Sequence, residues 1–363
     1  METTAAVLRS PDGAYTLETV TLRDIGPDEV LVRIVGAGMC HTDVLPRVPD
    51  FMAAPPIING HEGAGIVEAV GADVNSVKVD DHVVLSFDSC GACENCNAGV
   101  PAYCDTFMVR NLSGQAVDGT STATGADGKD IKSRWFGQSS FAHHAIARER
   151  NSVVVDKSLP LELMGPLGCG IQTGAGSILV ALDVQPGTSV AVYGAGAVGL
   201  AAVMGAKVAG ASTIIAVDLQ DSRLELAREL GATHVLRGDA PDLAEQITQI
   251  SGGGAHYAFD STGVPAVIST AIATTRMAGK CGLVGVQQGD VALDATSIGK
   301  TILNILEGSA DPQKFIPQMV HLWQDGKFPF DKLIEKFPMS QINEAEKSSL
   351  SGGAIKPVLI PEA

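Results

Sequence analysis

The chain of 363 residues is poor in aromatic and basic side chains. Phe, Trp and Tyr make up 4% of it, and 25 Lys and Arg stand against 41 Asp and Glu, for a formal net charge of −16. Because nucleic acids and anionic lipids attract positively charged surfaces, this balance argues against either as a general partner. We therefore expect the partners to be small molecules.

Long apolar runs are also missing. The start, Met1–Ala5, has neither the basic nor the apolar region of a secretory signal, and no run of about 18 apolar residues follows. These absences predict a cytoplasmic protein that does not span a membrane. At 45% hydrophobic residues, a chain of this length can bury one large core or, more in keeping with its size, two.

The seven cysteines are an odd number in a chain without a secretory signal, which argues against a disulfide framework. Four of them follow the pattern C-x2-C-x2-C-x7-C, namely Cys90, Cys93, Cys96 and Cys104. This spacing is typical of four thiolates that surround one metal ion as a tetrahedron. The alternative is four reduced thiols without a metal.

The pattern of expected secondary structure changes near residue 170. Before about Arg150, short β-rich runs lie among Gly, Pro and Asn, at Val30–Val35, Gly65–Val70 and His82–Leu85. They predict an irregular β domain. Beyond residue 170, strands and helices alternate.

The alternating part begins with a buried strand at Ser189–Tyr193 and a helix at Leu200–Ala209. Further helices are expected at 222–230, 242–250 and 266–277, and strands at 213–217, 233–236, 256–259 and 281–286. This rhythm predicts an α/β fold with a doubly wound parallel sheet. After about residue 309 the rhythm is lost and the chain is expected to rejoin the first domain. The predicted domains are thus 1–171 with 309–363, and 172–308.

A glycine motif lies between the first of these strands and its helix. Gly194, Gly196 and Gly199, with Val198 among them, fit G-x-G-x-x-G, in which backbone amides at a helix N-terminus bind a pyrophosphate. In a chain with 41 glycines the pattern alone can arise by chance. Its place between a strand and a helix indicates a dinucleotide site.

Asp218 ends the second strand of this series, 24 residues after Gly194. A carboxylate there is placed to bond an adenosine ribose and to repel a 2′-phosphate, which favours NAD over NADP. The alternative is a solvated carboxylate at a strand end. Arg223 is assigned to the same cofactor-binding set.

The segment Gly60–Gly65, read GHEGAG, with Gly71 and Val74 resembles the signature G-H-E-x2-G-x5-G-x2-V of zinc alcohol dehydrogenases. From about residue 5 to residue 360 the chain resembles medium-chain, zinc-dependent alcohol dehydrogenases, with most likeness to the bacterial branch that acts on benzyl, aryl and allylic alcohols. That likeness is carried by Met39–Asp43, Phe136–Phe141, Gly165–Gly176 and Gly326–Lys332. It implies a Rossmann domain, an irregular β-rich (GroES-like) catalytic domain, and a homodimer or homotetramer.

The resemblance implies two zinc ions per chain. A catalytic zinc would be held by Cys40, His61 and Cys169, leaving one position for water or substrate, and the four-cysteine cluster would hold a structural zinc. Thiolates and imidazole are ligands that Zn²⁺ prefers. A cysteine taken singly is more simply a packed hydrophobe, and Cys281 is interpreted that way.

Further roles follow from the resemblance. Glu62 would lie behind the zinc ligands or act as an alternative ligand, and Asp43 would orient the imidazole. Thr42 would carry away the alcohol proton, unless it is an ordinary capping threonine. His41 and Lys356 would contact the coenzyme pyrophosphate.

One position departs from the family pattern. Many relatives have a His five residues after the first cysteine ligand to end the proton relay, whereas this chain has Leu45. The relay is therefore expected to be shortened or rerouted, with water or a coenzyme ribose hydroxyl accepting the proton.

Three phenylalanines are candidates for the walls of the substrate pocket: Phe51, Phe87 and Phe141. Such walls favour a flat, apolar alcohol. The alternative is that they are ordinary core aromatics.

The resemblance thus implies reversible oxidation of primary aromatic or allylic alcohols to aldehydes, with hydride transfer to NAD. One alternative is a thiol-dependent formaldehyde dehydrogenase, which shares both zinc sites but normally needs charged pocket residues. Another is a noncatalytic NAD-binding redox sensor that uses the cysteine cluster as its switch. The presence of Cys40, Thr42, His61 and Cys169 argues against a sensor, which needs no open metal site.

Overall fold

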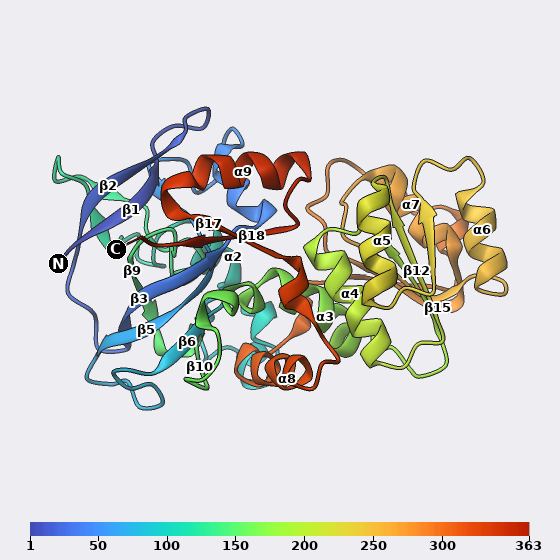
Figure 1. Cartoon of the computed structure of the whole chain (residues 1–363), viewed down its shortest axis with the longest axis horizontal. Helices are drawn as coiled ribbons and strands as arrows, with labels where there is room; N and C mark the ends of the chain where they lie inside the picture. Colours follow the sequence, from blue (N-terminus) through green and yellow to red (C-terminus); the bar gives the residue numbers. More distant parts are fainter. Residues whose placement is uncertain (363) are drawn as a thin grey trace. The chain divides into compact units, whose positions relative to one another are not determined.

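Two units, each built around its own sheets, divide the chain (Figure 1). The computed structural model describes residues 1–362. Unit 1 comprises residues 1–169, 311–317 and the C-terminal part from Asp331, and unit 2 comprises residues 170–310 and 318–330. Within the described residues, none of the helices combines the length and hydrophobicity needed to cross a membrane.

Unit 1 contains two sheets. The first has the order β4-β1-β2-β7-β8, made of β1 (Glu2–Leu8), β2 (Tyr15–Leu22), β4 (Ile57–Ile58), β7 (Ala123–Thr124) and β8 (Asp130–Ile131). The second has the order β10-β6-β5-β3-β18-β17, and β9 also pairs with β3. Its strands are β3 (Glu29–Gly38), β5 (Glu62–Val70), β6 (His82–Leu85), β9 (His144–Arg148), β10 (Ser152–Val155), β17 (Ile334–Pro338) and β18 (Lys356–Ile360).

The three strands expected in this unit are present as β3, β5 and β6, and β3 and β5 are longer than predicted. β3 alternates buried and less buried side chains around Val30, Val32 and Ile34, as a strand with one face on a core does. Helices between the strands of unit 1 include η1 (His41–Arg47), α1 (Glu94–Asn97), α2 (Phe107–Leu112), η3 (Trp135–Gly137), η6 (Gly165–Gly168) and α9 (Ile342–Ser351).

Unit 2 is a doubly wound α/β domain. Its sheet has the order β13-β12-β11-β14-β15-β16 and every pairing is parallel, in strands β11 (Ser189–Tyr193), β12 (Thr213–Asp218), β13 (His234–Arg237), β14 (Ala255–Asp260), β15 (Thr275–Leu283) and β16 (Thr301–Asn304). In chain order this is 3-2-1-4-5-6, the Rossmann order. All five residues of β11 are buried, because helices cover both faces of the sheet.

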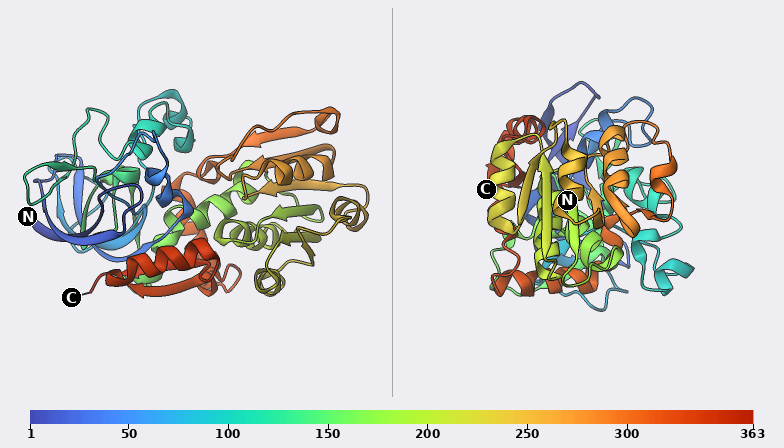
Figure 2. Two further views of the ribbon diagram at one scale, coloured as in Figure 1. Left: turned by 90° about the horizontal axis from the view of Figure 1, so that it is seen from above. Right: turned by 90° about the vertical axis from the view of Figure 1, so that its right-hand side faces the viewer.

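The helices of unit 2 are α3 (Gly170–Gly176), α4 (Ala197–Val208), α5 (Asp221–Leu230), α6 (Leu243–Ile250) and α7 (Pro265–Thr274), and α8 (Pro312–Gln324) begins in unit 1. Helices α4 and α5 contact each other, and so do α6 and α7, on opposite faces of the sheet (Figures 1 and 2). The expected doubly wound fold is confirmed.

Two expectations need correction. The helix expected at 266–277 ends at Thr274, because Thr275 becomes extended and pairs with Ala255, so that β15 begins there rather than at Cys281 and ends at Leu283 rather than Val286. The expected domain bounds, 1–171 with 309–363 and 172–308, also shift. The boundary between the units lies at 169/170, and residues 318–330, which include the second part of α8, belong to unit 2. The alternation of strands and helices in the sequence does not indicate which hydrophobic core a helix packs against.

Glu29, at the start of β3, anchors a buried ion-pair group in unit 1. Its carboxylate accepts hydrogen bonds from Arg23 at 2.7 and 2.9 Å, from the Gly26 amide at 2.7 Å and from Arg134 at 2.8 Å. Burial alone would raise the pKa of Glu29, but these donors and the Arg134 charge outweigh it and lower that pKa to about 2. Arg134 directly precedes η3 and is itself buried.

We predict that Glu29→Gln lowers the free energy of unfolding at pH 7 by about 2–3 kcal/mol. A carboxylate with a lowered folded pKa stabilises above its ordinary pKa near 4.5, and that stability is lost as the pH falls through about 2. The difference between wild type and Glu29→Gln in the free energy of unfolding, measured by urea titration, should therefore become smaller at acid pH. Glu68→Gln, which removes the exposed Arg33–Glu68 pair, is the control and should cost less than about 1 kcal/mol. If this difference in the free energy of unfolding does not change with pH, the lowered pKa of Glu29 is contradicted.

Candidate active site

Four potential metal ligands converge inside unit 1. One ligand atom from each of Cys40, His61, Glu62 and Cys169 lies within 4.8 Å of the others. The pairing of β3 with β5 explains the convergence, since Gly38 is opposite Glu62 and brings the residues after β3 next to those before β5. Gly38 is required here, because a Cβ on it would meet Glu62 Oε2 at 2.1 Å. Cys169 arrives from the end of η6.

Asp43, in η1, accepts hydrogen bonds from two residues of this cluster and from two of its neighbours. Its Oδ1 accepts hydrogen bonds from His61 Nδ1 at 2.9 Å, from Trp135 Nε1 at 3.0 Å and from the Gly60 amide at 3.1 Å. Its Oδ2 accepts one from the Cys40 amide at 3.0 Å. The Asp43 carboxylate, expected to orient the imidazole, therefore contacts the His61 ring directly. It also bonds the backbone amides of Cys40 and Gly60.

The cluster fits a metal ion by the state of its donors. His61 is fully buried, its Nδ1 faces Asp43, and its Nε2 has no hydrogen-bond partner within residues 1–362. A buried nitrogen of this kind is rare unless it binds something. A hydrogen bond from Cys169 and the charge of Lys356 hold the pKa of the Cys40 thiol well below its ordinary value, which favours the metal-binding thiolate. The cluster is therefore suited to zinc.

Lys356 contradicts its expected role at the coenzyme. Its Nζ donates to Glu62 Oε1 at 2.8 Å, to Glu62 Oε2 at 2.9 Å and to the Met39 carbonyl at 3.1 Å, and the residue is 2% exposed. A lysine ammonium has three donors, so none remains for a pyrophosphate. This ion pair also holds the Glu62 carboxylate next to Cys40, His61 and Cys169.

The residues after Cys40 have different surroundings. The thiol of Cys40 lies 3.6 Å from Thr42 Oγ1, so the hydroxyl expected to carry a proton is beside the cluster. Leu45 is half-buried and packs against the core of unit 1. His41 is exposed, and its contact with a coenzyme pyrophosphate stays a prediction.

A row of aromatic rings lies next to His61, and three of its members, Trp135, Phe136 and Phe107, were not predicted as site residues from the sequence. The ring of Phe136 stacks on His61 with centroids 4.3 Å apart, and Trp135 meets His61 edge-on at 6.5 Å. Phe51 contacts Trp135 at 6.1 Å. Phe87 joins the row less directly, through Phe107, which in turn contacts Phe136. In the sequence, Phe136 stands out only as part of a segment with family likeness, and no spacing rule marks its ring as a neighbour of His61.

Phe141 is not a wall of a substrate pocket. Its side chain is 0% exposed, packs edge-on against Tyr15 and lies against Gly60, where a Cβ would meet the ring at 2.5 Å. The ring therefore fills the core behind the cluster and leaves no surface for a substrate. Gly60 has a φ of +88°, so glycine serves both the backbone conformation and this close approach.

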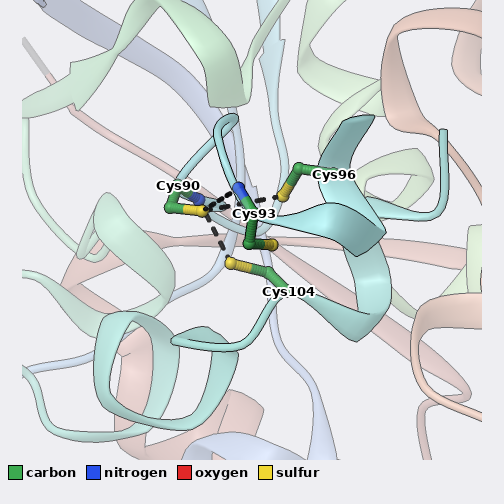
Figure 3. Close-up of side chains that lie close together, drawn as sticks. All are labelled: Cys90, Cys93, Cys96 and Cys104. Atoms are coloured by element: carbon green, nitrogen blue, oxygen red, sulfur yellow. Dashed lines mark hydrogen bonds between the residues drawn. The ribbon is translucent and has the colours of Figure 1, made fainter. Parts of the chain in front are cut away.

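The segment 90–104, between β6 and β7, brings its four cysteine side chains together (Figure 3) and is called the four-cysteine lobe. All four sulfurs lie within 4.8 Å of one another, and those of Cys90 and Cys96 are 3.9 Å apart. A tetrahedral zinc with Zn–S bonds of about 2.3 Å separates its sulfurs by about 3.8 Å. Amides of Ala92 and Cys93 donate to the Cys90 sulfur, and the Ala92 amide in particular lowers the pKa of that thiol. The geometry is that of a closed metal site.

The glycine motif opens α4 in unit 2. Gly194 has a φ of +90°, and a Cβ on Gly199 would meet the Gly194 carbonyl at 1.7 Å, so both positions require glycine. Gly196 is the N-cap of α4, and a Cβ there would enter open space, which leaves room for a ligand beside the helix N-terminus. Val198 is the second residue of α4.

Asp218 lies at the end of β12, next to this turn. Its Oδ2 accepts a hydrogen bond from the Ala195 amide at 2.7 Å and its Oδ1 from the Gln220 amide at 2.9 Å. Arg223 Nη1 is 3.9 Å from Asp218 Oδ2. The carboxylate is thus held against the glycine turn, as binding of a ribose there would require.

Family models match both units of the chain. A model described as zinc-binding dehydrogenase matches residues 197–323, and one described as alcohol dehydrogenase GroES-like domain matches residues 26–157. A geraniol dehydrogenase of Castellaniella defragrans is 48% identical over 98% of this chain and 97% of its own length. An NDMA-dependent alcohol dehydrogenase of Amycolatopsis methanolica is 35% identical over the full length of both chains.

Solved structures agree with these relatives. A benzyl alcohol dehydrogenase of Acinetobacter calcoaceticus has 44% identity and a TM-score of 0.96, and an alcohol dehydrogenase zinc-binding domain protein of Burkholderia ambifaria has 46% and 0.97; each match covers both chains completely. Together with the Cys40–His61–Cys169 donor set, these matches show that the chain belongs to the zinc-dependent medium-chain alcohol dehydrogenase family.

Proposed function

We propose that this protein catalyses the reversible oxidation of primary aromatic or allylic alcohols to aldehydes, with NAD as the hydride acceptor. The observation that carries the proposal is the cluster of Cys40, His61 and Cys169, in which the buried His61 Nε2 has no hydrogen-bond partner within the described chain and Thr42 lies beside Cys40. Two thiolates and one imidazole make a three-ligand zinc site that leaves a position open for substrate.

The substrate class is supported by the rings around His61 and by two relatives. Trp135 and Phe136 contact His61, and Phe51 extends the row. Aromatic rings favour flat, apolar ligands. The relatives at 48% and 44% identity are named for geraniol, an allylic alcohol, and benzyl alcohol, an aromatic one.

Each residue of the cluster has a distinct part in the proposed reaction. A zinc ion polarises an alcohol oxygen and lowers its pKa when bound at such a site, and a nicotinamide accepts the hydride. Cys40, His61 and Cys169 would hold the metal, and Asp43 keeps the imidazole in one orientation. The Thr42 hydroxyl would accept the alcohol proton and pass it on to water or, with a coenzyme bound, to a ribose hydroxyl, because the Leu45 side chain has no group that can take it.

The two alternatives have less support. A thiol-dependent formaldehyde dehydrogenase needs a cation in its pocket, whereas Lys356, the cation next to the cluster, uses its donors on Glu62 and Met39. A noncatalytic redox sensor would need no buried three-ligand site with a polar hydroxyl beside it. NAD is proposed because Asp218 would repel a 2′-phosphate.

A panel of substrates and acceptors tests the proposal. With NAD, kcat/KM for benzyl alcohol and geraniol should exceed that for ethanol by about 10- to 100-fold, the scale of burying an aromatic side chain. NADP should be used poorly. Formaldehyde with a thiol tests the first alternative, and NDMA tests the acceptor for which one relative is named. Higher kcat/KM with ethanol, or equal use of NADP, would contradict the proposal.

Metal analysis of the purified protein should give two zinc ions per chain. Cys90→Ser should lose one of them and lower the melting temperature, because the four-cysteine lobe would lose the ion that closes it. The remaining ion should stay with the Cys40–His61–Cys169 cluster. Fully active protein with a zinc content near zero would overturn both assignments.

Thr42 is tested by the burst of NADH in the first turnover, which slow product release does not mask. Thr42→Val keeps the shape but lacks the hydroxyl, and should slow the burst near neutral pH by about 10²- to 10⁴-fold, the usual contribution of general acid–base catalysis. Thr42→Ser keeps the hydroxyl and should remain close to wild type. A Thr42→Val burst as fast as wild type would show that Thr42 is not the proton relay; capping is no alternative role, because the N-cap of η1 is Cys40.

A further inference from the structure

Trp135 has a polar contact that its burial does not by itself require. The side chain is 0% exposed, and its Nε1 donates to Asp43 Oδ1 at 3.0 Å, the same oxygen that accepts from His61 Nδ1. A buried indole N–H needs an acceptor, but any carbonyl would serve. Here the acceptor is the carboxylate that orients a metal-ligating histidine.

The backbone that carries Trp135 is held firmly. Its amide donates to Ser139 Oγ at 2.8 Å, and Ser139 Oγ donates to the Ile58 carbonyl at 2.6 Å. The preceding residue, Arg134, pairs with the buried Glu29. The indole is therefore presented to Asp43 from a segment that has little freedom to move.

The next residue shows that two rings are aimed at the same site. Phe136 has a φ of +51° and a ψ of +36°, a left-handed conformation that costs a non-glycine residue about 1 kcal/mol. This conformation places the Phe136 ring flat on His61 while the adjacent Trp135 bonds Asp43. Strain of this kind persists where the surroundings demand a particular geometry.

We propose that Trp135 is a positioning residue for the catalytic zinc site: its indole N–H fixes the Asp43 carboxylate, which fixes His61, and so slows the loss of zinc. The inference rests on the proposed function, since it requires zinc at the Cys40–His61–Cys169 cluster. Without the indole, Asp43 Oδ1 keeps two donors and the carboxylate can rotate. The imidazole then follows it away from the metal.

The test is the rate at which a chelator removes zinc. Trp135→Phe keeps a ring but removes the N–H, and should release the zinc of this cluster about 10-fold faster, in the range found when such outer partners of a metal ligand are lost. The release phase is assigned by its absence in Cys169→Ser. Replacing Trp135 by β-(3-benzothienyl)alanine, which has the shape of tryptophan without the N–H, should give the same acceleration and separates it from any packing defect.

Two controls make the outcome specific. Phe51→Leu removes a ring that packs on Trp135 but leaves the N–H in place, and should not change the release rate. In an Asp43→Ala background, which removes the oxygen shared by Trp135 and His61, Trp135→Phe should have little further effect, because the route from the indole to the imidazole is already broken.

Each other outcome overturns the proposal. A purely electronic role predicts slower release, because a carboxylate freed of one donor makes His61 a more basic ligand. A purely structural role predicts a lower melting temperature with unchanged release. Wild-type protein without zinc at this cluster would sink the proposed function itself, whereas zinc that leaves wild type and Trp135→Phe at equal rates would sink only this inference.

Discussion

The site depends on one buried carboxylate. Asp43 accepts hydrogen bonds from the Cys40 and Gly60 amides, from His61 and from Trp135, and so ties together the chain after β3, the chain before β5 and η3. A buried charge with unfilled oxygens would cost several kcal/mol. Because the donors come from three separate segments, the carboxylate is satisfied only when all three are in place. The hydrogen bonds of Asp43 therefore help to hold the three segments of the cluster together.

A second buried charge pair connects this cluster to the C-terminus. Lys356, the first residue of β18, pairs with Glu62, the first residue of β5, and both are buried. β18 reaches this position by pairing antiparallel with β3 and parallel with β17. The positive charge of Lys356 lowers the pKa of Cys40, so the last strand contributes to keeping a thiolate in the cluster. The pair is thus part of the electrostatics of the site rather than a coenzyme contact.

The features that could be predicted from the sequence are those that depend on the spacing of neighbouring residues. The cysteine pattern, the GHEGAG segment and the glycine motif between a strand and a helix each occupy a few neighbouring positions, and each appears in the structure where it was expected. Trp135, Phe136, Lys356 and Phe141 were missed or misassigned because their surroundings arise from pairings across long stretches of chain. Nothing near Trp135 in the sequence indicates Asp43, which lies 92 residues away. The end of α7 was misplaced for a similar reason, since pairing of Thr275 with Ala255 overrides a helical pattern that continues to Met277.

The central claim is that the buried cluster of unit 1 holds the zinc ion that serves the alcohol oxidation. Anomalous diffraction from crystals of active enzyme, recorded on both sides of the zinc absorption edge, locates zinc without reference to activity. The account predicts a peak bonded to Cys40 Sγ, Cys169 Sγ and His61 Nε2, with Zn–S near 2.3 Å and Zn–N near 2.0–2.1 Å. No peak at this cluster in active crystals, or zinc only in the four-cysteine lobe, would contradict it.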